Sequence, residues 1–479
     1  MTNSPLVIDL DGTLIRSDLT YEICVLHLKK NWFVGLFEII FWFFSDKATA
    51  KSKLAKLHLT NLNFELIPLT ELVQMDLFKG ARVKALVSGS DHRIVKEIAN
   101  RIGNFELVQG STPSRNLTGE NKAAFLSETY PNGFDYIGDS SADLSVWKRA
   151  RTSYGYNVSK SIVQTANRQD IILKVLKQKP SQIKPILKAM RMHHWSKNIL
   201  LAVIPFLNLS MFELSWFLSI LLAFVAFGLS ASSTYIINDL LDIQEDRAHL
   251  TKRERPFASG TLEIKNGLIS AISMMCIGLL IAFALSFNFG LMLIGYTVVS
   301  FTYSLYLKRI MVLDTLILSF LFCWRLISGG ILLEMPANIW FVISMGFFFL
   351  SLAMGKRTIE IYSIKETDKK IAGRGYMSID YLIVLISGIC SSFICLVIVL
   401  IYSLLSKSTV INNDISIIII LFILLFWQVR FWLLTGRNQV FDDPIVFALK
   451  DRISIISLSS LLLVLIVEQF PQIMVLYYG

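Results

Sequence analysis

Two aspartates near the N-terminus, Asp9 and Asp11, have the type and spacing of an acid/base pair. They are two residues apart, with Leu10 between them, and follow the apolar run of residues 5–8, which is typical of a buried strand. Both carboxylates can therefore point into a crevice at the carboxyl edge of a sheet. A carboxylate attacks a phosphate only where a metal ion and a cation neutralise charge, and a second acid must protonate the departing alkoxide.

Three further motifs follow this pair in order along the chain. Residues 86–90 read as an apolar strand that ends in a hydroxyl group, and Ser88 is the candidate residue. Lys122 stands at the start of a helical pattern, and residues 136–143 read as a strand that ends in Asp139 and Asp143. Ordinary turn residues would explain any one motif, but the ordered set favours a single phosphate site.

The ordered set resembles the haloacid dehalogenase (HAD) superfamily of Mg²⁺-dependent phosphatases over about residues 5–157. The resemblance implies that Asp9 is the nucleophile that forms an aspartyl-phosphate and that Asp11 is the general acid/base. It also implies that Ser88 and Lys122 hold phosphoryl oxygens and that residues 18–80 form a cap. The implied Mg²⁺ ligands are Asp9, Asp11, Asp139 and Asp143. A catalytically silent copy of such a domain is the alternative.

A second group of acids, at Asp239, Asp242 and Asp246, lies at the end of a long apolar run. Their spacing places the three carboxylates within about 60° of one another on a helix. Such a cluster is costly at a membrane unless a metal ion or a cation neutralises it. Bases that suit phosphate oxygens follow at Arg247, Lys252, Arg253 and Arg255. The combination favours a site for Mg²⁺ and a diphosphate; a solvated loop with salt bridges is the alternative.

The stretch from Asn238 to Pro256 resembles the first aspartate-rich motif of the UbiA superfamily of intramembrane prenyltransferases, and the resemblance covers about residues 185–475. It implies that this motif binds one or more Mg²⁺ ions and the diphosphate of an isoprenoid donor. A second aspartate-rich motif normally lies in the loop that corresponds to residues 356–378. Here that loop is basic and lacks a repeated Asp-x-x-x-Asp.

This departure resembles one branch of the family, the decaprenyl-phosphate phosphoribosyltransferases. Further segments that resemble the branch lie at residues 191–198, 303–308 and 355–357, and at Asp314 with Arg325. The branch implies phosphoribosyl pyrophosphate as donor and a polyprenyl phosphate as acceptor. Candidate phosphate-binding residues are Arg191, Lys197, Asn198, Asn238, Lys252, Arg253, Arg255, Lys308, Lys356 and Arg357. Each base alone would also serve as a charge that sets membrane topology.

The overall composition indicates which class of protein must position these candidate site residues. The chain has 479 residues, of which 54% are hydrophobic and 17% charged, with a formal net charge of +10. Soluble domains average about 45–50% apolar and 25% charged residues, so a wholly soluble chain, a disordered chain and a disulfide scaffold are all disfavoured. The five cysteines lack close-paired spacing and read as small buried hydrophobes.

The chain is expected to have two unequal parts and a linker. Residues 1–178 alternate strand and helix patterns, which predicts an α/β domain with a parallel, doubly covered sheet and a small helical cap. Residues 179–198 form a basic juxtamembrane linker, and residues 199–479 form an all-α membrane domain. Residues 31–44 are very aromatic but shorter than the roughly 20 residues of a spanning helix. They predict a helix at the membrane surface or, equally, a buried core helix.

Nine apolar stretches are expected to span the bilayer, beginning with residues 199–212 and ending with residues 452–470. One set of connections is basic, with Lys308, Lys365, Lys369, Lys370 and Arg374 among its residues. The opposite set contains Glu213, Glu334, Lys407 and Asp414. The positive-inside rule then predicts a cytoplasmic N-terminal domain and an external C-terminus at Gly479.

Together these features predict an integral membrane transferase fused to a phosphatase. It would move a phosphoribosyl group to a polyprenyl phosphate and then remove the 5-phosphate from the lipid-linked product. One alternative is a prenyltransferase that uses an isoprenyl diphosphate and an aromatic or other small acceptor; another is a transporter or scaffold with a regulatory soluble domain. The expected partners are phosphorylated lipids and the bilayer. The positive charge does not require nucleic acid, and the oligomeric state stays open.

Overall fold

The computed structural model describes residues 4–30, 32–80, 82–208, 214–335, 337–362, 374–405, 414–440 and 444–478. The chain divides into two compact units. The N-terminal unit comprises Met1–Met190 with Tyr235–Ile272, and the membrane unit comprises Arg191–Thr234 with Ser273–Gly479. Some residues named above lie outside the described residues: Glu213, Lys365, Lys369, Lys370, Lys407 and Gly479.

A six-stranded sheet forms the centre of the N-terminal unit, with strand order β3-β2-β1-β4-β5-β6. The strands are β1 (Leu6–Ile8), β2 (Lys84–Asp91), β3 (Leu107–Ser111), β4 (Asp135–Gly138), β5 (Thr152–Val158) and β6 (Leu173–Gln178). Every neighbouring pair is parallel, and Ile8 is in register with Leu86 of β2 and with Ile137 of β4. The parallel α/β prediction is thus confirmed.

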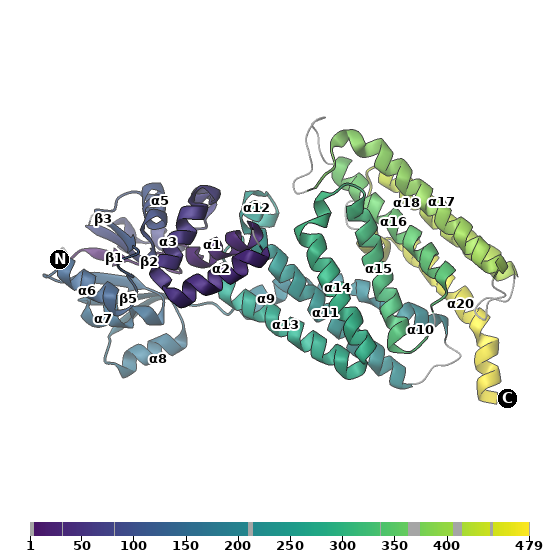
Figure 1. Ribbon diagram of the computed structural model, residues 1–479, viewed down its shortest axis with the longest axis horizontal. Helices are drawn as coiled ribbons and strands as arrows, with labels where there is room; N and C mark the ends of the chain where they lie inside the picture. The colour runs from purple at the N-terminus through teal and green to yellow at the C-terminus, as the bar shows by residue number, and fades with distance from the viewer. Residues whose placement is uncertain are drawn as a thin grey trace. The chain divides into compact units, whose positions relative to one another are not determined.

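Both faces of the sheet are covered because successive residues of β1 point to opposite sides. Leu6 and Ile8 belong to one buried cluster, which includes Ile94 and Ile98 of α5 (His92–Ile102). Val7 belongs to a second cluster, which includes residues from the helices on the other face. Those helices are α6 (Glu120–Thr129), α7 (Leu144–Arg149) and α8 (Lys160–Arg168). Figure 1 shows these helices beside the strands.

The segment between β1 and β2, predicted as a cap, is helical. Its helices are α1 (Leu19–Lys30), α2 (Trp32–Ser45), α3 (Lys47–His58) and α4 (Asp76–Lys79). Asp46 caps α3, because its carboxylate accepts the backbone N–H groups of Ala48 and Thr49. The aromatic residues predicted as a surface or core helix form α2, and α2 keeps Phe41 at 71% and Phe44 at 88% exposure.

The rest of the N-terminal unit comes from the linker and from residues 235–272. The linker contributes α9 (Ile183–Met190), and the later segment contributes α12 (Ile243–Ala248). The same segment holds the end of α11 (Leu214–Leu241) and the start of α13 (Ile264–Leu285). The aspartate-rich residues therefore belong to the same compact unit as the parallel sheet.

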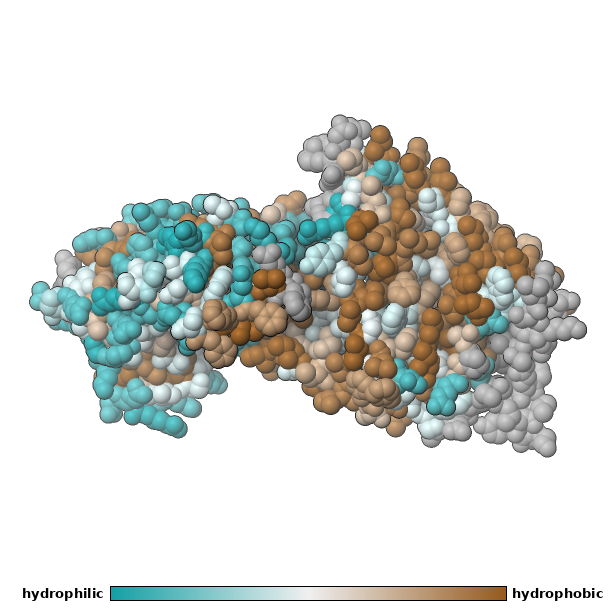
Figure 2. Space-filling model, viewed as in Figure 1, coloured by the Kyte–Doolittle hydropathy of each residue, from teal (hydrophilic) through white to brown (hydrophobic). Residues whose placement is uncertain are grey.

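Seven helices in the described part of the chain are long and apolar enough to cross a membrane. They are Ser215–Leu241, Ile264–Leu285, Phe287–Leu305, Leu313–Leu332, Ile339–Tyr362, Ser378–Ser403 and Ile415–Gly436. Within the helix bounds of the structure these spans correspond to α11, α13, α14 (Phe287–Leu305), α15 (Leu313–Leu332), α16 (Ile339–Tyr362), α17 (Tyr381–Leu405) and α18 (Asp414–Gly436). In Figure 2 apolar surface covers these helices, whereas hydrophilic surface covers the parallel sheet.

The first and last of the nine predicted spans are not among these seven helices. The first is a 3₁₀ segment, Met192–Ala202, followed by the five-residue helix α10 (Val203–Leu207). Pro205 lies in α10 and has no backbone N–H to donate, which disfavours one long helix there. The last corresponds to α20 (Arg452–Tyr478), which follows the short helix α19 (Pro444–Lys450).

Candidate active sites

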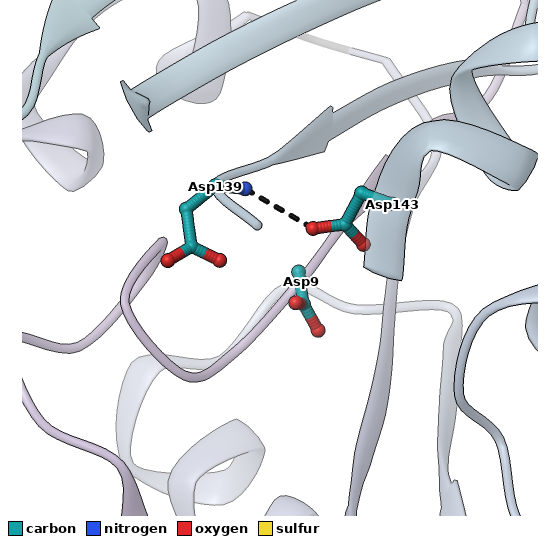
Figure 3. A group of neighbouring side chains, drawn as sticks. All are labelled: Asp9, Asp139 and Asp143. Atoms are coloured by element: carbon teal, nitrogen blue, oxygen red, sulfur yellow. Dashed lines mark hydrogen bonds between the residues drawn. The ribbon is translucent and has the colours of Figure 1, made fainter. Parts of the chain in front are cut away.

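The carboxyl edge of the parallel sheet brings three predicted acids together. Asp9 follows β1, Asp139 follows the neighbouring strand β4, and Asp143 lies one turn later. One carboxylate oxygen from each residue lies within 4.8 Å of the others, and Figure 3 shows the three side chains around one point. They converge because the carboxyl ends of adjacent parallel strands meet at one sheet edge.

Lys122, at the start of α6, completes this acid cluster. Its Nζ donates to Oδ1 of Asp9 at 2.9 Å and lies 3.6 Å from Oδ1 of Asp143. The Tyr136 hydroxyl donates to Asp143 at 2.6 Å, and the backbone N–H groups of Asp139 and Ser140 donate to the same carboxylate. Asp143 is therefore held in place, while Lys122 neutralises part of the charge on Asp9.

Asp11 lies beside this cluster with two serines. Its Oδ2 accepts from Ser90 Oγ at 2.6 Å and from Ser88 Oγ at 3.3 Å. Its Oδ1 accepts the backbone N–H of Leu19, the first residue of α1. The start of the predicted cap is therefore bonded directly to the candidate acid/base.

Gly12 is required by the close approach of Asp139. Its φ is +76°, and a Cβ there would lie 2.2 Å from Oδ2 of Asp139. A side chain at this position would push the carboxylate away from Asp9 and strain the backbone. The Asp-x-Asp-Gly order therefore has a steric reason in the fold.

Burial raises the pKa of three acids at this edge, Asp9, Asp11 and Asp139. The pKa of Asp9 rises to about 7, mainly through desolvation, with Lys122 opposing the rise and Asp143 adding to it. Desolvation and Asp18 raise the pKa of Asp11 to about 6. Desolvation and Asp143 also raise the pKa of Asp139 well above its usual range. One lysine thus leaves several buried acids under-compensated, so a divalent cation with oxygen ligands fits this cluster.

Sequence patterns had not singled out three other residues at this edge. Ser90 lies closer to Asp11 than Ser88 does, and it is the second hydroxyl of the same strand end. Lys51 of α3 donates to the carbonyl of Gly89, and its charge favours ionised Asp11. Tyr136 bonds to Lys122 and Asp143. The sequence signal that could have found it is its place in the strand that ends in Asp139 and Asp143.

The aspartate-rich segment forms a second candidate site. Nη1 of Arg255 lies 3.1 Å from Oδ1 of Asp239 and 2.7 Å from Oδ2 of Asp246. Asp239 is in the last turn of α11 and Asp246 is in α12, with Asp242 between the two helices. Burial raises the pKa of Asp246, and Arg255 opposes that rise. Two carboxylates thus share one cationic nitrogen.

This arrangement also suits a metal ion. A single positively charged atom bridges oxygens of two buried carboxylates, which is the role that a divalent cation takes in an oxygen-ligand site. The structure brings Asp239 and Asp246 together at this nitrogen, but among the described residues Asp242 does not join them in a group close enough to hold one ion. Asn238 precedes Asp239 in the chain. Lys252 and Arg253 are exposed on the following 3₁₀ turn.

Asp242 is paired with a residue from the predicted cap. Nζ of Lys29, in α1, lies 3.1 Å from Oδ1 of Asp242 and 2.6 Å from Oε1 of Glu245. The pairing was not predictable from spacing, because 213 positions separate Lys29 and Asp242.

Arg247 forms an ion pair with Glu22 rather than with the aspartates of its own segment. Its two Nη atoms donate to the two carboxylate oxygens of Glu22, at 2.9 and 2.6 Å, and its Nε donates to the carbonyl of Ala258. Both charged side chains are at most 2% exposed. Arg247 therefore joins α12 to α1 and is not placed to bind a phosphate.

The membrane unit contains a buried charge cluster around Asp314. Its Oδ2 accepts from Nε of Arg357 at 2.6 Å and from Nη1 of Arg374 at 3.2 Å, and its Oδ1 accepts from the Tyr376 hydroxyl. Arg357 also pairs with Glu360 at 2.6 Å. The predicted phosphate-binding residue Arg357 is thus fully buried among acids and hydroxyls.

The membrane unit also contains a buried hydrogen-bonded pair, Arg325 and Asn198. Nε of Arg325 donates to Oδ1 of Asn198 at 3.1 Å, and Arg325 also bonds to the hydroxyl of Tyr296. Nζ of Lys197 lies 5.5 Å from the ring centroid of Phe322. The other candidate bases of this unit are Arg191, just before the 3₁₀ segment; Lys308, in the connection after α14; and Lys356, in α16.

Comparisons with known proteins identify the class of the membrane part. The model of the UbiA prenyltransferase family matches residues 199–449. An uncharacterized protein y4nM of Sinorhizobium fredii is 33% identical over 468 residues, which cover 94% of this chain and 88% of that protein. A decaprenyl-phosphate phosphoribosyltransferase of Mycolicibacterium smegmatis is 35% identical over 193 residues, covering 40% of this chain and 61% of that enzyme.

A solved UbiA homolog from Archaeoglobus fulgidus, bound to GPP and Mg²⁺, superposes with a TM-score of 0.46 and 17% identity. The match covers 60% of this chain and 99% of that one. On the family match over residues 199–449, the chain belongs to the UbiA prenyltransferase family. It is accordingly a multi-pass membrane protein of an intramembrane transferase family, with a parallel α/β sheet in its N-terminal unit.

Proposed function

We propose that this chain carries out two consecutive reactions. The membrane domain transfers a phosphoribosyl group from phosphoribosyl pyrophosphate to a polyprenyl phosphate. The N-terminal α/β domain is a HAD-type phosphatase that removes the 5-phosphate from the lipid-linked product. The observation that carries the proposal is the single nitrogen of Arg255 between Asp239 and Asp246, a pair of carboxylates arranged around one positive charge.

The transferase step needs little base catalysis, because a lipid phosphate is already ionised. One of its oxygens forms a bond to ribose C1, and the bond between C1 and the diphosphate oxygen breaks with its electron pair on diphosphate. Asp239, Asp242 and Asp246 would hold Mg²⁺, which would supply charge neutralisation for the leaving group. Arg255, Lys252 and Arg253 would bind its oxygens, and positioning rather than proton transfer would lower the barrier.

The donor assignment is supported by similarity to a decaprenyl-phosphate phosphoribosyltransferase over 193 residues. It is also supported by the basic character of the connection after α16, where a second acidic motif would be expected for ordinary prenyl transfer. Arg191, Lys197, Asn198, Lys308 and Lys356 are the residues that we propose for the lipid phosphate and the donor phosphates. Arg357 is better placed to hold Asp314 than to bind a substrate.

In the phosphatase step Asp9 would attack the phosphorus atom while Asp11 protonates the departing 5-oxygen. Water, deprotonated by Asp11, would then hydrolyse the aspartyl-phosphate and release inorganic phosphate. Lys122 and Ser88 would bind the phosphoryl oxygens, and Asp9, Asp11, Asp139 and Asp143 form the proposed Mg²⁺ site. The distances among Asp9, Asp139, Asp143 and Lys122 support this assignment. For both reactions to share one lipid, the N-terminal domain would lie on the cytoplasmic side and the C-terminus outside.

Membranes that contain the full chain test both reactions. They would be incubated with phosphoribosyl pyrophosphate labelled in the ribose, a polyprenyl phosphate and Mg²⁺, and the lipid extract analysed. We expect a labelled lipid whose ribose has lost its 5-phosphate. With Asp9→Asn the labelled lipid should retain that phosphate, and with Asp239→Asn no labelled lipid should form.

Glu254→Gln is the matched control, because Glu254 is an exposed acid in the same segment. Labelled lipid from an isoprenyl diphosphate and an aromatic acceptor, but not from the ribose donor, would refute the phosphoribosyl assignment. The same phosphorylation state of the product with and without Asp9 would refute the phosphatase assignment.

A further inference from the structure

We propose that Lys29, a residue of the N-terminal α/β domain, is part of the diphosphate-binding site at the aspartate-rich segment. It would pair with Asp242 while the site is empty of substrate and bind a diphosphate oxygen when the metal–diphosphate arrives. This inference rests on the proposed function of the aspartate-rich segment, and it adds a residue that lies more than 200 positions away from that motif in the sequence.

The starting observation is that each aspartate of the motif is paired with a basic side chain of the protein. Arg255 bridges Asp239 and Asp246, and Lys29 takes Asp242. A lysine has three N–H donors, so Lys29 also reaches Glu245 at 2.6 Å. In the absence of metal, these two cations offset part of the charge of the three aspartates.

Solvent exposure distinguishes the ion pair of Lys29 and Asp242, which can be replaced by contacts to a ligand, from the pair of Glu22 and Arg247, which cannot. Lys29 is 18% exposed and Asp242 is 24% exposed, so a ligand can reach both. The neighbouring pair of Glu22 and Arg247 is at most 2% exposed. A partly exposed ion pair contributes little to stability, so its exchange for another anion costs little.

The buried pair keeps Lys29 within reach of the site. Glu22 and Lys29 are seven residues apart on α1, about two helical turns, and so lie on one face of that helix. Glu22 is bonded to Arg247 and also accepts from Gln244, both in α12. Because α1 is anchored to α12 at Glu22, its Lys29 end is held at Asp242 by a rigid element.

A metal ion at the motif would change the partner of Lys29. The aspartates would hold the ion through carboxylate oxygens that Lys29 and Arg255 now occupy, and a diphosphate bound with it would add several negative oxygens. A lysine released from Asp242 then has a stronger anion beside it, since charge-assisted bonds to phosphate are short and strong. The same displacement would free Arg255 from Asp239 and Asp246 to bind a diphosphate oxygen.

The test uses the full chain in detergent and magnesium pyrophosphate as the probe. Isothermal titration calorimetry would compare the wild type with Lys29→Ala, Lys29→Arg and Lys30→Ala. Lys30 is the matched control, because it is an exposed lysine next to Lys29 on α1. We expect Lys29→Ala to weaken pyrophosphate binding about tenfold, which corresponds to the loss of one charge-assisted hydrogen bond. Lys29→Arg and Lys30→Ala should stay within about threefold of the wild type.

Amine-specific labelling gives a second measurement that does not depend on a variant. In the wild type, magnesium pyrophosphate should reduce modification of Lys29 at least about threefold and leave Lys30 unchanged, as measured by peptide mass spectrometry. Unchanged or increased modification of Lys29 would overturn the proposal, because a merely displaced lysine becomes more reactive. Equal affinities of the wild type and Lys29→Ala would do the same.

The two hypotheses fail in different ways. If the wild type binds no magnesium pyrophosphate, the aspartate-rich segment is not a diphosphate site, and the proposed function fails with it. If the wild type binds the probe and forms labelled lipid while Lys29 has no effect, only the role of Lys29 is refuted.

Discussion

Arg357 and Asp314 form an ion pair whose side chains are both fully buried, with Nε of the arginine 2.6 Å from Oδ2 of the aspartate. The guanidinium group uses its other nitrogens on Glu360 and on the hydroxyl of Tyr303. A planar group with separate donors on each side fits this arrangement, whereas a lysine would supply one point charge. The contact joins the start of α15 to α16 within the membrane unit.

Replacing Arg357 by Met is therefore expected to destabilise the membrane unit by about 3 kcal/mol, because it removes the closest cation from the buried Asp314 and leaves only Arg374 and the Tyr376 hydroxyl beside that carboxylate. Arg357→Lys should recover only part of this loss. Arg309→Ala, at an exposed base of the preceding connection, is the control and should change stability by less than about 0.5 kcal/mol. Unfolding in mixed micelles with increasing SDS measures the difference. Equal stability of Arg357→Met and the wild type would contradict the structural role.

Asp11→Asn should slow hydrolysis of an alkyl phosphate by about 10²–10⁴-fold, because the departing oxygen loses its proton donor. An aryl phosphate with a good leaving group should lose much less, since that leaving group needs little protonation. Release of inorganic phosphate by the full chain provides the measurement, with exposed Asp170→Asn as the control. If both substrates lost activity equally, Asp11 would not act as the general acid.

The metal-free N-terminal unit should lose stability as the pH rises. Burial raises the pKa of Asp9 to about 7 and that of Asp11 to about 6, from 3.8. The folded state thus binds more protons than the unfolded state between about pH 4 and 7, and its stabilisation disappears as the pH passes through the folded pKa values. In EDTA we expect the Tm of this unit to be lower at pH 8 than at pH 5.

Added Mg²⁺ should raise the Tm at pH 8 more than at pH 5, because it replaces the missing protons as a source of neutralisation. Asp139→Asn removes one of the buried charges and should flatten the dependence in EDTA. A Tm that rises with pH in EDTA, or one that ignores Mg²⁺ at pH 8, would show that the cluster carries no uncompensated charge.

Helix α2 should contact lipid in the native membrane. Its exposed large apolar side chains exceed what an ordinary soluble surface presents on one short helix: Val34, Leu36, Phe37, Ile40, Phe41 and Phe44. A photoactivatable lipid should therefore label peptides from α2, and Phe41→Ser with Phe44→Ser should reduce the labelling several-fold. Helix α5 provides the comparison, because its apolar residues Ile94, Val95 and Ile98 are buried in the sheet domain. Equal labelling of the two helices would exclude a preferred membrane contact.

Local patterns were enough to predict the acid cluster at the sheet edge. Each of Asp9, Asp139 and Lys122 stands at a strand end or helix start, and parallel strands bring such ends together without further information. The same reasoning located the long apolar helices, since membrane spans carry their signal in a single uninterrupted stretch.

Other contacts have no local signature. Arg247 and Arg255 occur in one basic run, yet one pairs with Glu22 and the other with the aspartates of its own segment. Arg357 lies near the end of the membrane helix α16, where a topology-setting charge would also stand, and only its neighbours reveal that it is buried. The stretch at residues 199–212 is mostly apolar, but in its described part, up to residue 208, the 3₁₀ backbone and Pro205 limit its α-helix to five residues.

The pair of Glu22 and Arg247 has a consequence for how the chain is made. The two residues are 225 positions apart, so Glu22 leaves the ribosome long before its partner is synthesised. At roughly 5–20 residues per second, the delay is about 10–45 s. During that time the sheet strands can assemble, but a carboxylate that is buried in the mature protein has no guanidinium to meet. The surface of α1 is completed only when α11 and α12 have been synthesised, so maturation of the N-terminal unit is coupled to insertion of its own membrane anchor.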